Sequence, residues 1–248
     1  MRVMFLGLLS AAVLSLGGPA AATAETVDLQ LILTSDVSRS IDSEEFKLQR
    51  EGYAAALENP EVLSAIRSGP NGAIAVTFIE WSSVSEQKVV VDWSVIRDGE
   101  GAAVVASQIR SAARSFVGHT SISDGLDFAV KRFEGSGFAS PRRVIDVAGD
   151  GTNNSGRPIS DARDDAVEKG IVVNGLAIIN LNPNFGFIAH TQPPGGLPNY
   201  YRENVIGGPG SFVLQIDDFQ SFAAAMVQKL VTEISGLPVD RDGKLAAK

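Results

Sequence analysis

The 248-residue sequence contains no cysteine. Disulfides, thiolate metal sites, a cysteine nucleophile and a lipid-modified cysteine are therefore excluded. Histidine is almost as scarce, since only His119 and His190 occur, which leaves few ways to form a Ser–His catalytic pair. The chain also lacks the Gly-x-Ser-x-Gly sequence of hydrolases and the phosphate-binding Gly-x-x-x-x-Gly-Lys sequence. These absences disfavour an enzyme.

Positive charge is in deficit, with 21 Lys and Arg against 29 Asp and Glu, a net charge of −8. So acidic a chain is a poor candidate for binding nucleic acid or an anionic membrane surface. Long hydrophobic runs are scarce too, and the clearest covers residues 3–16, after Arg2 and before Ala22-Thr23-Ala24. A positive start, a short apolar core and a small-x-small site are typical of a signal peptide.

We therefore expect residues 1–24 to be a signal peptide, and the mature protein to be periplasmic or extracellular without a membrane span. Loss of Arg2 would leave 20 basic residues against 29 acidic ones, a net charge of −9. Residues 25–236 are long enough to form one domain with its own core. Residues 237–248 are expected to form a polar, disordered C-terminal tail.

Short apolar runs alternate with segments of helical periodicity along the mature chain. The runs that predict strands cover residues 29–33, 73–81, 88–93, 142–148, 171–178 and 211–215. The link at residues 82–86 is too short for a crossover, so the second and third strands should form an antiparallel hairpin. The pattern predicts a three-layer α/β/α fold of Rossmann-like type, with a mostly parallel central sheet and one antiparallel edge hairpin.

Polar oxygen donors follow the first strand at every second position: Asp36, Ser38 and Ser40. Ligands of open parallel sheets bind beyond the carboxyl ends of the strands. Carboxylate and hydroxyl oxygens suit a hard cation such as Mg²⁺. A simpler interpretation is that this segment only leads into a helix capped by Asp42, with Glu45 completing a capping box.

Two further motifs fall at ends of predicted elements: Gly118-His119-Thr120 before a helix and Gly149-Asp150-Gly151 after a central strand. With Asp36-x-Ser38-x-Ser40, they make the chain resemble the von Willebrand factor type A (VWA) domain with its metal-ion-dependent adhesion site (MIDAS). The resemblance covers residues 27–234 and is closest to a bacterial exported branch of uncharacterised function.

The resemblance implies a cation, Mg²⁺ or Mn²⁺, held by the five motif residues. Ser38 and Ser40 would bind it directly, and Thr120 directly or through water. Asp36 and Asp150 would act mainly through bridging waters and by orienting the hydroxyls. Neutral hydroxyls leave the charge of a cation largely uncompensated, so a protein partner could supply an Asp or Glu carboxylate as a further ligand.

Two residues depart from the family pattern. Gly149 stands where many members have Thr or Ser, so one supporting hydroxyl is missing. His119 stands where a small residue is usual, and it would either tune the site or face the solvent, which is the usual fate of a histidine beside a loop. Outside the motifs, Asp146 interrupts an apolar strand, and we expect it to be buried and hydrogen-bonded to a neighbouring loop.

Three functions remain open. The first is an exported, metal-dependent protein-binding module, adhesive or adaptor-like, that is not an enzyme. The second is a metal-dependent hydrolase or phosphatase, and the third is a structural domain whose metal only joins three loops. In the first case the irregular region from Asn180 to Pro198 is a candidate for partner recognition, because it should emerge beside the cation and long irregular loops are usually functional or disordered.

Overall fold

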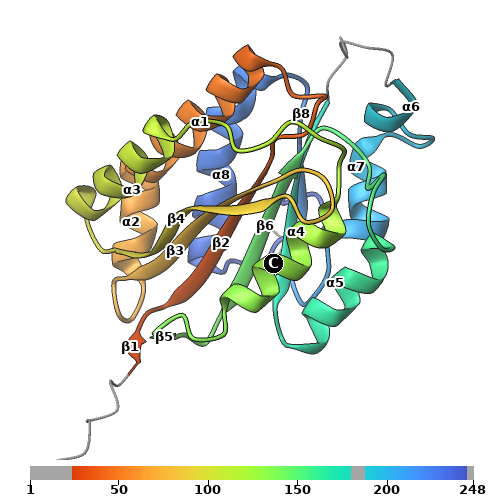
Figure 1. Cartoon of the computed structure of the whole chain (residues 1–248). Coiled ribbons are helices and arrows are strands. Elements are labelled where there is room, and N and C mark those ends of the chain that lie inside the picture. The colour runs from red at the N-terminus through yellow and green to blue at the C-terminus, as the bar shows by residue number, and fades with distance from the viewer. Residues whose placement is uncertain (1–23, 180–187, 245–248) are drawn as a thin grey trace, which may run out of the picture.

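The computed structural model describes residues 24–179 and 188–244 (Figure 1). Its centre is a six-stranded sheet with the strand order β4-β3-β2-β6-β7-β8. The strands are β2 (Leu29–Asp36), β3 (Ile74–Trp81), β4 (Gln87–Ile96), β6 (Arg143–Gly149), β7 (Val172–Ile178) and β8 (Val213–Ile216). All six were expected from the apolar runs, although several boundaries differ by one to three residues.

Neighbouring strands are parallel except for β3 and β4, which form the antiparallel hairpin at one edge. The predicted fold class is therefore confirmed. A small parallel pair that was not predicted, β1 (Glu25–Thr26) with β5 (Phe138–Ala139), lies at the amino-terminal end of β2. Since β2 and β6 are adjacent and parallel, Asp36 and Asp150 leave the sheet at the same edge.

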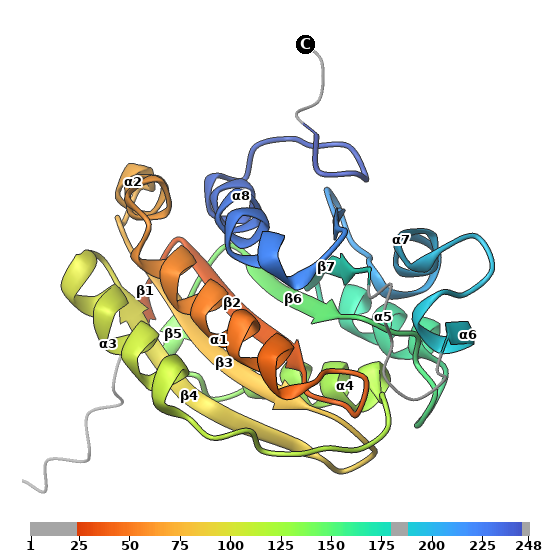
Figure 2. The ribbon, with the colours of Figure 1, turned by 90° about the horizontal axis from the view of Figure 1, so that it is seen from above.

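Helices cover both faces of the sheet and make the outer two layers (Figures 1 and 2). One face packs against α1 (Ser43–Glu58), α2 (Pro60–Ser68), α3 (Gly99–Ser111) and α8 (Phe222–Ser235). The other face packs against α4 (Ile122–Arg132), α5 (Ile159–Glu168), α7 (Leu197–Tyr200) and the π-helix η1 (Tyr201–Val205). Two short elements complete the described chain: α6 (Ile188–Thr191) and the 3₁₀ turn η2 (Phe219–Ser221).

Capping residues and proline determine where several helices begin. Asp42 and Glu45 form the expected capping box at the start of α1, and Pro60 begins the separate helix α2. The helical spacing of apolar residues continues to Phe116, but α3 ends at Ser111 because Ala112 already has an extended backbone. The freed segment, residues 112–120, carries Thr120 to the edge of the sheet where β2 and β6 end.

Residues 237–244 of the expected C-terminal tail are among the described residues and contact the domain. The backbone N–H of Val213 donates to Arg241 O at 3.0 Å, and Arg202 pairs with Asp242 at 2.6 Å. The predicted signal peptide, apart from Ala24, and residues 245–248 lie outside the described residues. Within the described ranges, none of the helices combines the length and apolar character needed to cross a membrane.

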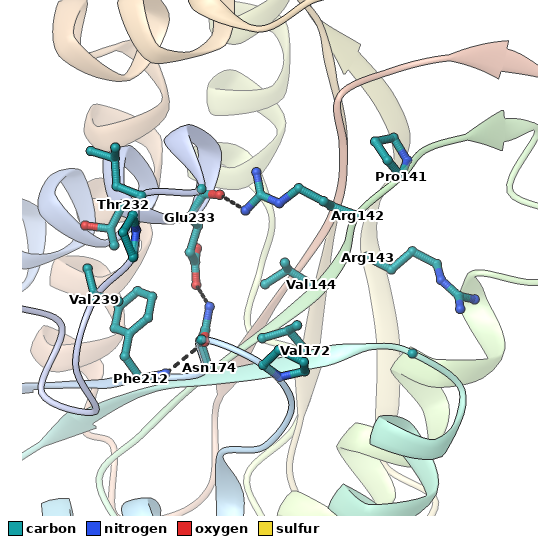
Figure 3. A pocket seen from close by; sticks show the side chains of 16 residues that line it. Pro141, Arg142, Arg143, Val144, Val172, Asn174, Phe212, Thr232, Glu233 and Val239 are labelled. Atoms are coloured by element: carbon teal, nitrogen blue, oxygen red, sulfur yellow. Dashed lines mark hydrogen bonds between the residues drawn. The ribbon is translucent and has the colours of Figure 1, made fainter. Parts of the chain in front are cut away.

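Three charged side chains are buried together between the sheet and α8. Lys229 Nζ lies 2.8 Å from a carboxylate oxygen of Asp146 on β6 and 2.5 Å from Glu233 Oε1. Asn174 on β7 also donates to Glu233 Oε1, at 2.8 Å (Figure 3). Asp146 is fully buried, as expected, but its charged partner is a helix lysine and not a loop. Glu233 and Asn174 line a cavity of about 340 Å³ at the amino-terminal edge of the sheet, away from the predicted site.

Candidate metal centre

The structure brings together all five residues that the sequence singled out. Asp36 ends β2, Ser38 and Ser40 lie in the turn after it, Thr120 precedes α4, and Asp150 follows β6. All five are buried, with at most 6% of any of these residues exposed. Residues from three separate segments therefore converge on one point at the carboxyl edge of the sheet.

The three hydroxyl groups form a compact cluster. Ser38 Oγ lies 3.2 Å from Ser40 Oγ, and Thr120 Oγ1 donates to Ser38 Oγ at 3.0 Å. Ser40 Oγ donates to Asp150 Oδ1 at 2.6 Å, so Asp150 orients a hydroxyl as the resemblance implies. Asp36 instead accepts from the backbone N–H of Ser38 at 2.7 Å and fixes the turn.

Two buried carboxylates under the hydroxyls make the site electrostatically strained without a cation. Burial, and then the charge of Asp150, raise the pKa of Asp36 to about 8. Asp36 Oδ2 is buried and has no hydrogen-bond partner among the described residues. A positive charge placed beside these oxygens would offset both the desolvation and the mutual repulsion.

Side chains outside the motifs hold the loops in place. The Arg114 guanidinium donates to Val37 O at 2.7 Å and Ser38 O at 2.6 Å, which ties the extended segment before α4 to the turn after β2. Asn154 exchanges two hydrogen bonds with the backbone of Thr120, both of 2.9 Å. Neither residue was singled out in the sequence, because an Arg or Asn in a loop carries no distinctive pattern.

Gly118 lies where the β3–β4 link supports the Thr120 loop. Its N–H donates to Ser82 Oγ at 2.7 Å, and the next N–H, of His119, donates to Ser83 Oγ at 2.8 Å. A Cβ at position 118 would lie 2.2 Å from Ser83 Oγ, so a side chain does not fit. The His119 side chain is exposed, as expected for a histidine beside a loop.

Tyr201 explains why position 149 is a glycine, where many members of the resembled family have Thr or Ser. A Cβ at position 149 would lie 2.7 Å from the Tyr201 hydroxyl and 3.1 Å from Asp36 Oδ2. Tyr201 is fully buried, and burial followed by the charges of Asp36 and Asp150 raises its pKa well above the usual value. The phenol therefore stays protonated and fills the place beside Asp36 that a Thr or Ser side chain would otherwise take.

We expect Gly149→Ala to lower the free energy of unfolding by about 1–3 kcal/mol, because the added methyl group overpacks against the Tyr201 hydroxyl. Tyr201→Phe in the same chain removes that hydroxyl and should recover much of the loss, as urea unfolding in EDTA would show. Gly99→Ala is the control, since its Cβ would meet no atom closer than 3.8 Å. An equal loss from Gly149→Ala in the presence and in the absence of the Tyr201→Phe substitution would contradict this explanation.

His190, which the sequence offered only as one of two histidines, lies directly on the hydroxyl cluster. Its Nε2 is 3.0 Å from Thr120 Oγ1, and its Nδ1 is 3.0 Å from Thr152 Oγ1. Burial, and then the nearby His119, lower its pKa. Both histidines line a small cavity of about 90 Å³ together with Ser38, Ser40 and Thr120.

The position of His190 bears on the expectation that residues 180–198 emerge beside the cation. Strand β7 is parallel to its neighbour β6, so this connection leaves the sheet at the edge that carries the motifs, as predicted. Residues 180–187 lie outside the described residues. Residues 188–198 contain α6 and the start of α7, and α6 carries His190 to Thr120.

The donor set fits a divalent cation bound through oxygen. Three hydroxyls within 3.2 Å of a neighbour, two buried carboxylates and the unpartnered Asp36 Oδ2 are hard donors of the kind that Mg²⁺ and Mn²⁺ take. Among the residues that the structure describes, no group of three or more His, Cys, Asp or Glu side chains could hold a metal. A cation at this site would therefore depend on the hydroxyls.

Solved structures with similar folds share little sequence with this chain. The mussel byssus protein PTMP1, in a form with a zinc-occupied MIDAS motif, has a TM-score of 0.62 at 16% identity, over 86% of this chain and 49% of that one. A von Willebrand factor type A structure from Catenulispora acidiphila has a TM-score of 0.58 at 13% identity, over 84% and 43% of the two chains. The pilus adhesin SpaC from Lactobacillus rhamnosus GG has a TM-score of 0.58 at 14% identity, over 85% and 30%.

This chain thus spans about half the length of PTMP1 and less of the other two proteins. No protein of curated function gives a significant match. One family model, described as "Protein of unknown function (DUF1194)", matches residues 26–238. The match covers nearly the whole domain, so the chain belongs to this family, and its fold is that of the von Willebrand factor type A domain.

Proposed function

We propose that the protein is an exported, metal-dependent protein-binding module that captures an Asp or Glu carboxylate of a partner. Ser38, Ser40 and Thr120 would bind Mg²⁺ or Mn²⁺, with Asp36 and Asp150 behind them. The observation that carries the proposal is the hydroxyl cluster, which is built over two buried carboxylates and opens into a small cavity. PTMP1 with zinc in its MIDAS motif supports a metal at this place in the fold.

The chemistry of the donors suggests why a bound cation would attract a partner. Hydroxyl ligands are neutral, and the carboxylates Asp36 and Asp150 lie on the protein side of them, so the outer side of the cation would lack an anionic ligand. A carboxylate from another protein could complete that side by a charge-assisted contact, which is strong and directional. The metal would supply the attraction, and the loops around it would select the partner.

The test is capture of periplasmic or secreted proteins on immobilised wild-type protein, with Mg²⁺ and with EDTA. We expect a partner that is retained with Mg²⁺, released by EDTA and lost with Ser40→Ala, because that change removes a metal ligand. The control is Ser68→Ala, an exposed hydroxyl at the end of α2, which should retain the partner as the wild type does. Retention that is equal in EDTA and unaffected by Ser40→Ala would refute metal-dependent capture.

One observation favours a hydrolase instead: the 3.0 Å contact between Thr120 Oγ1 and His190 Nε2, which pairs a hydroxyl with an imidazole. Thr152 holds the other ring nitrogen, as an orienting residue would. Assays of ester and phosphoester hydrolysis separate the two functions. We expect no turnover from the wild type, whereas turnover that His190→Ala abolishes would favour the enzyme.

A further inference from the structure

We propose that His190 is an additional ligand of the cation, so that the site binds through one imidazole nitrogen as well as hydroxyl oxygens. The site would then favour a borderline metal such as Zn²⁺ more strongly than an oxygen-only site does. This inference rests on the metal site of the proposed function, but it does not depend on the capture of any partner.

The distances support a shared cation. Two ligands at right angles, each about 2.1 Å from an octahedral metal, lie about 3.0 Å apart. The separations are 3.2 Å for Ser38 Oγ–Ser40 Oγ, 3.0 Å for Thr120 Oγ1–Ser38 Oγ and 3.0 Å for Thr120 Oγ1–His190 Nε2. Each of these three separations is therefore close to that of two adjacent ligands of one cation.

His190 is held in this position by the loop after β6. Thr152 N–H donates to His190 O at 3.1 Å, and Thr152 Oγ1 lies 3.0 Å from Nδ1. The Thr120 hydroxyl donates to Ser38 Oγ, so Nε2 carries the hydrogen in its contact with Thr120 Oγ1. Metal binding would require the other tautomer, in which Nδ1–H donates to Thr152 Oγ1 and the lone pair of Nε2 faces the hydroxyl cluster. A metal-ligating histidine typically donates its other ring N–H to an oxygen acceptor, and Thr152 Oγ1 is placed to be that acceptor here.

The glycine after Asp150 makes room for the ring. A Cβ at position 151 would lie 2.1 Å from His190 Nε2 and 2.4 Å from the adjacent ring carbon Cε1. Any side chain at this position would therefore push the imidazole away from Thr120. Gly151→Ala thus offers a way to displace His190 without removing it.

An imidazole ligand changes which metal the site prefers. Imidazole nitrogen suits Zn²⁺ and other late first-row metals, whereas hydroxyl, carboxylate and water oxygens suit Mg²⁺. Loss of the nitrogen should weaken Zn²⁺ binding far more than Mg²⁺ binding. The ratio of the two affinities therefore reports on His190 even if a variant also changes the stability of the loop.

Calorimetric titration of the mature protein with Zn²⁺ and with Mg²⁺ tests this. We expect His190→Ala to lower the ratio of Zn²⁺ affinity to Mg²⁺ affinity by at least about tenfold, since changing even a residue that supports a metal ligand typically lowers metal affinity by about 10–100-fold. Gly151→Ala should also lower this ratio. His119→Ala is the matched control, since it removes the other histidine of the cavity and should leave the ratio unchanged. A ratio that is unchanged in His190→Ala would overturn the proposal.

Pulsed electron paramagnetic resonance on the Mn²⁺-loaded protein gives a second readout. We expect ¹⁴N modulation from a directly bound imidazole in the wild type and in His119→Ala, and its loss in His190→Ala. Mn²⁺ bound without that modulation would refute His190 as a ligand but leave the proposed function intact. Failure of every metal to bind would refute both, whereas ¹⁴N modulation without any captured partner would refute only the binding function.

Discussion

Replacing Asp36 with asparagine is expected to lower the affinity for Mg²⁺ by about 10–100-fold, the usual effect of losing a group that supports metal ligands. Asparagine has the same shape, and its oxygen can still accept from Ser38 N–H, so the turn after β2 should persist. What disappears is the negative charge whose second oxygen is buried without a hydrogen-bond partner among the described residues. Isothermal titration calorimetry measures the affinity directly.

The same substitution should not destabilise the metal-free protein. Burial and the charge of Asp150 disfavour the ionised form of Asp36, so a neutral side chain relieves an unfavourable interaction. Wild-type protein at a Mg²⁺ concentration of about 100 times Kd should gain about 2.7 kcal/mol in unfolding free energy, and Asp36→Asn at that concentration much less. Asp161→Asn, at an exposed carboxylate of α5, is the control. Unchanged Mg²⁺ affinity in Asp36→Asn would exclude Asp36 from the site.

Replacing Lys229 with methionine is expected to lower the free energy of unfolding by about 3–5 kcal/mol at pH 8, because two buried carboxylates lose their common cation. Lys229 is fully buried and lies within 2.8 Å of both Asp146 and Glu233. Lys47→Met is the control, since 72% of that side chain is exposed and its replacement should change stability by no more than about 0.5 kcal/mol. Urea unfolding measures both variants.

The loss should be smaller at pH 5. Burial, opposed by Lys229, raises the pKa of Asp146 to about 7. A raised pKa in the folded state means that the folded protein holds a proton that the unfolded chain releases above about pH 4. The stabilisation from that proton is therefore complete below about pH 4 and is lost as the pH rises through about 7. At pH 5 Asp146 is largely protonated in the folded protein, so loss of Lys229 leaves a smaller buried negative charge without a cation. A destabilisation by Lys229→Met that is no larger at pH 8 than at pH 5 would contradict this account.

The sheet could be predicted because its signals are local. Apolar runs define strands β2 and β6, and their parallel pairing brings Asp36 and Asp150 to one edge. The place of Thr120 beside them was implied by the resemblance to the VWA domain and not by strand pairing. The antiparallel hairpin followed from the length of a single link. None of these inferences required knowledge of which side chains distant in the sequence are in contact in the fold.

The rest of the site depends on packing between distant segments. Tyr201 reaches the space beside Gly149, and His190 reaches Thr120 across a separation of 70 residues. No spacing rule connects such pairs, and His190 lies on a four-residue helix with no periodicity to predict it. Asp146 could be recognised as a charge in an apolar strand, but its partner Lys229 lies 83 residues away and was found only in the structure.

A crystal structure of the protein grown with Mn²⁺, with the anomalous signal of the metal recorded, would show directly whether the hydroxyl cluster binds a cation. We expect one strong anomalous peak among Ser38 Oγ, Ser40 Oγ and Thr120 Oγ1, on the side away from the sheet relative to Asp36 and Asp150. Crystals of Asp36→Asn grown in the same way should give a much weaker peak. A wild-type map with no peak at the hydroxyl cluster, or with Mn²⁺ bound only elsewhere, would show that this cluster is not a metal site.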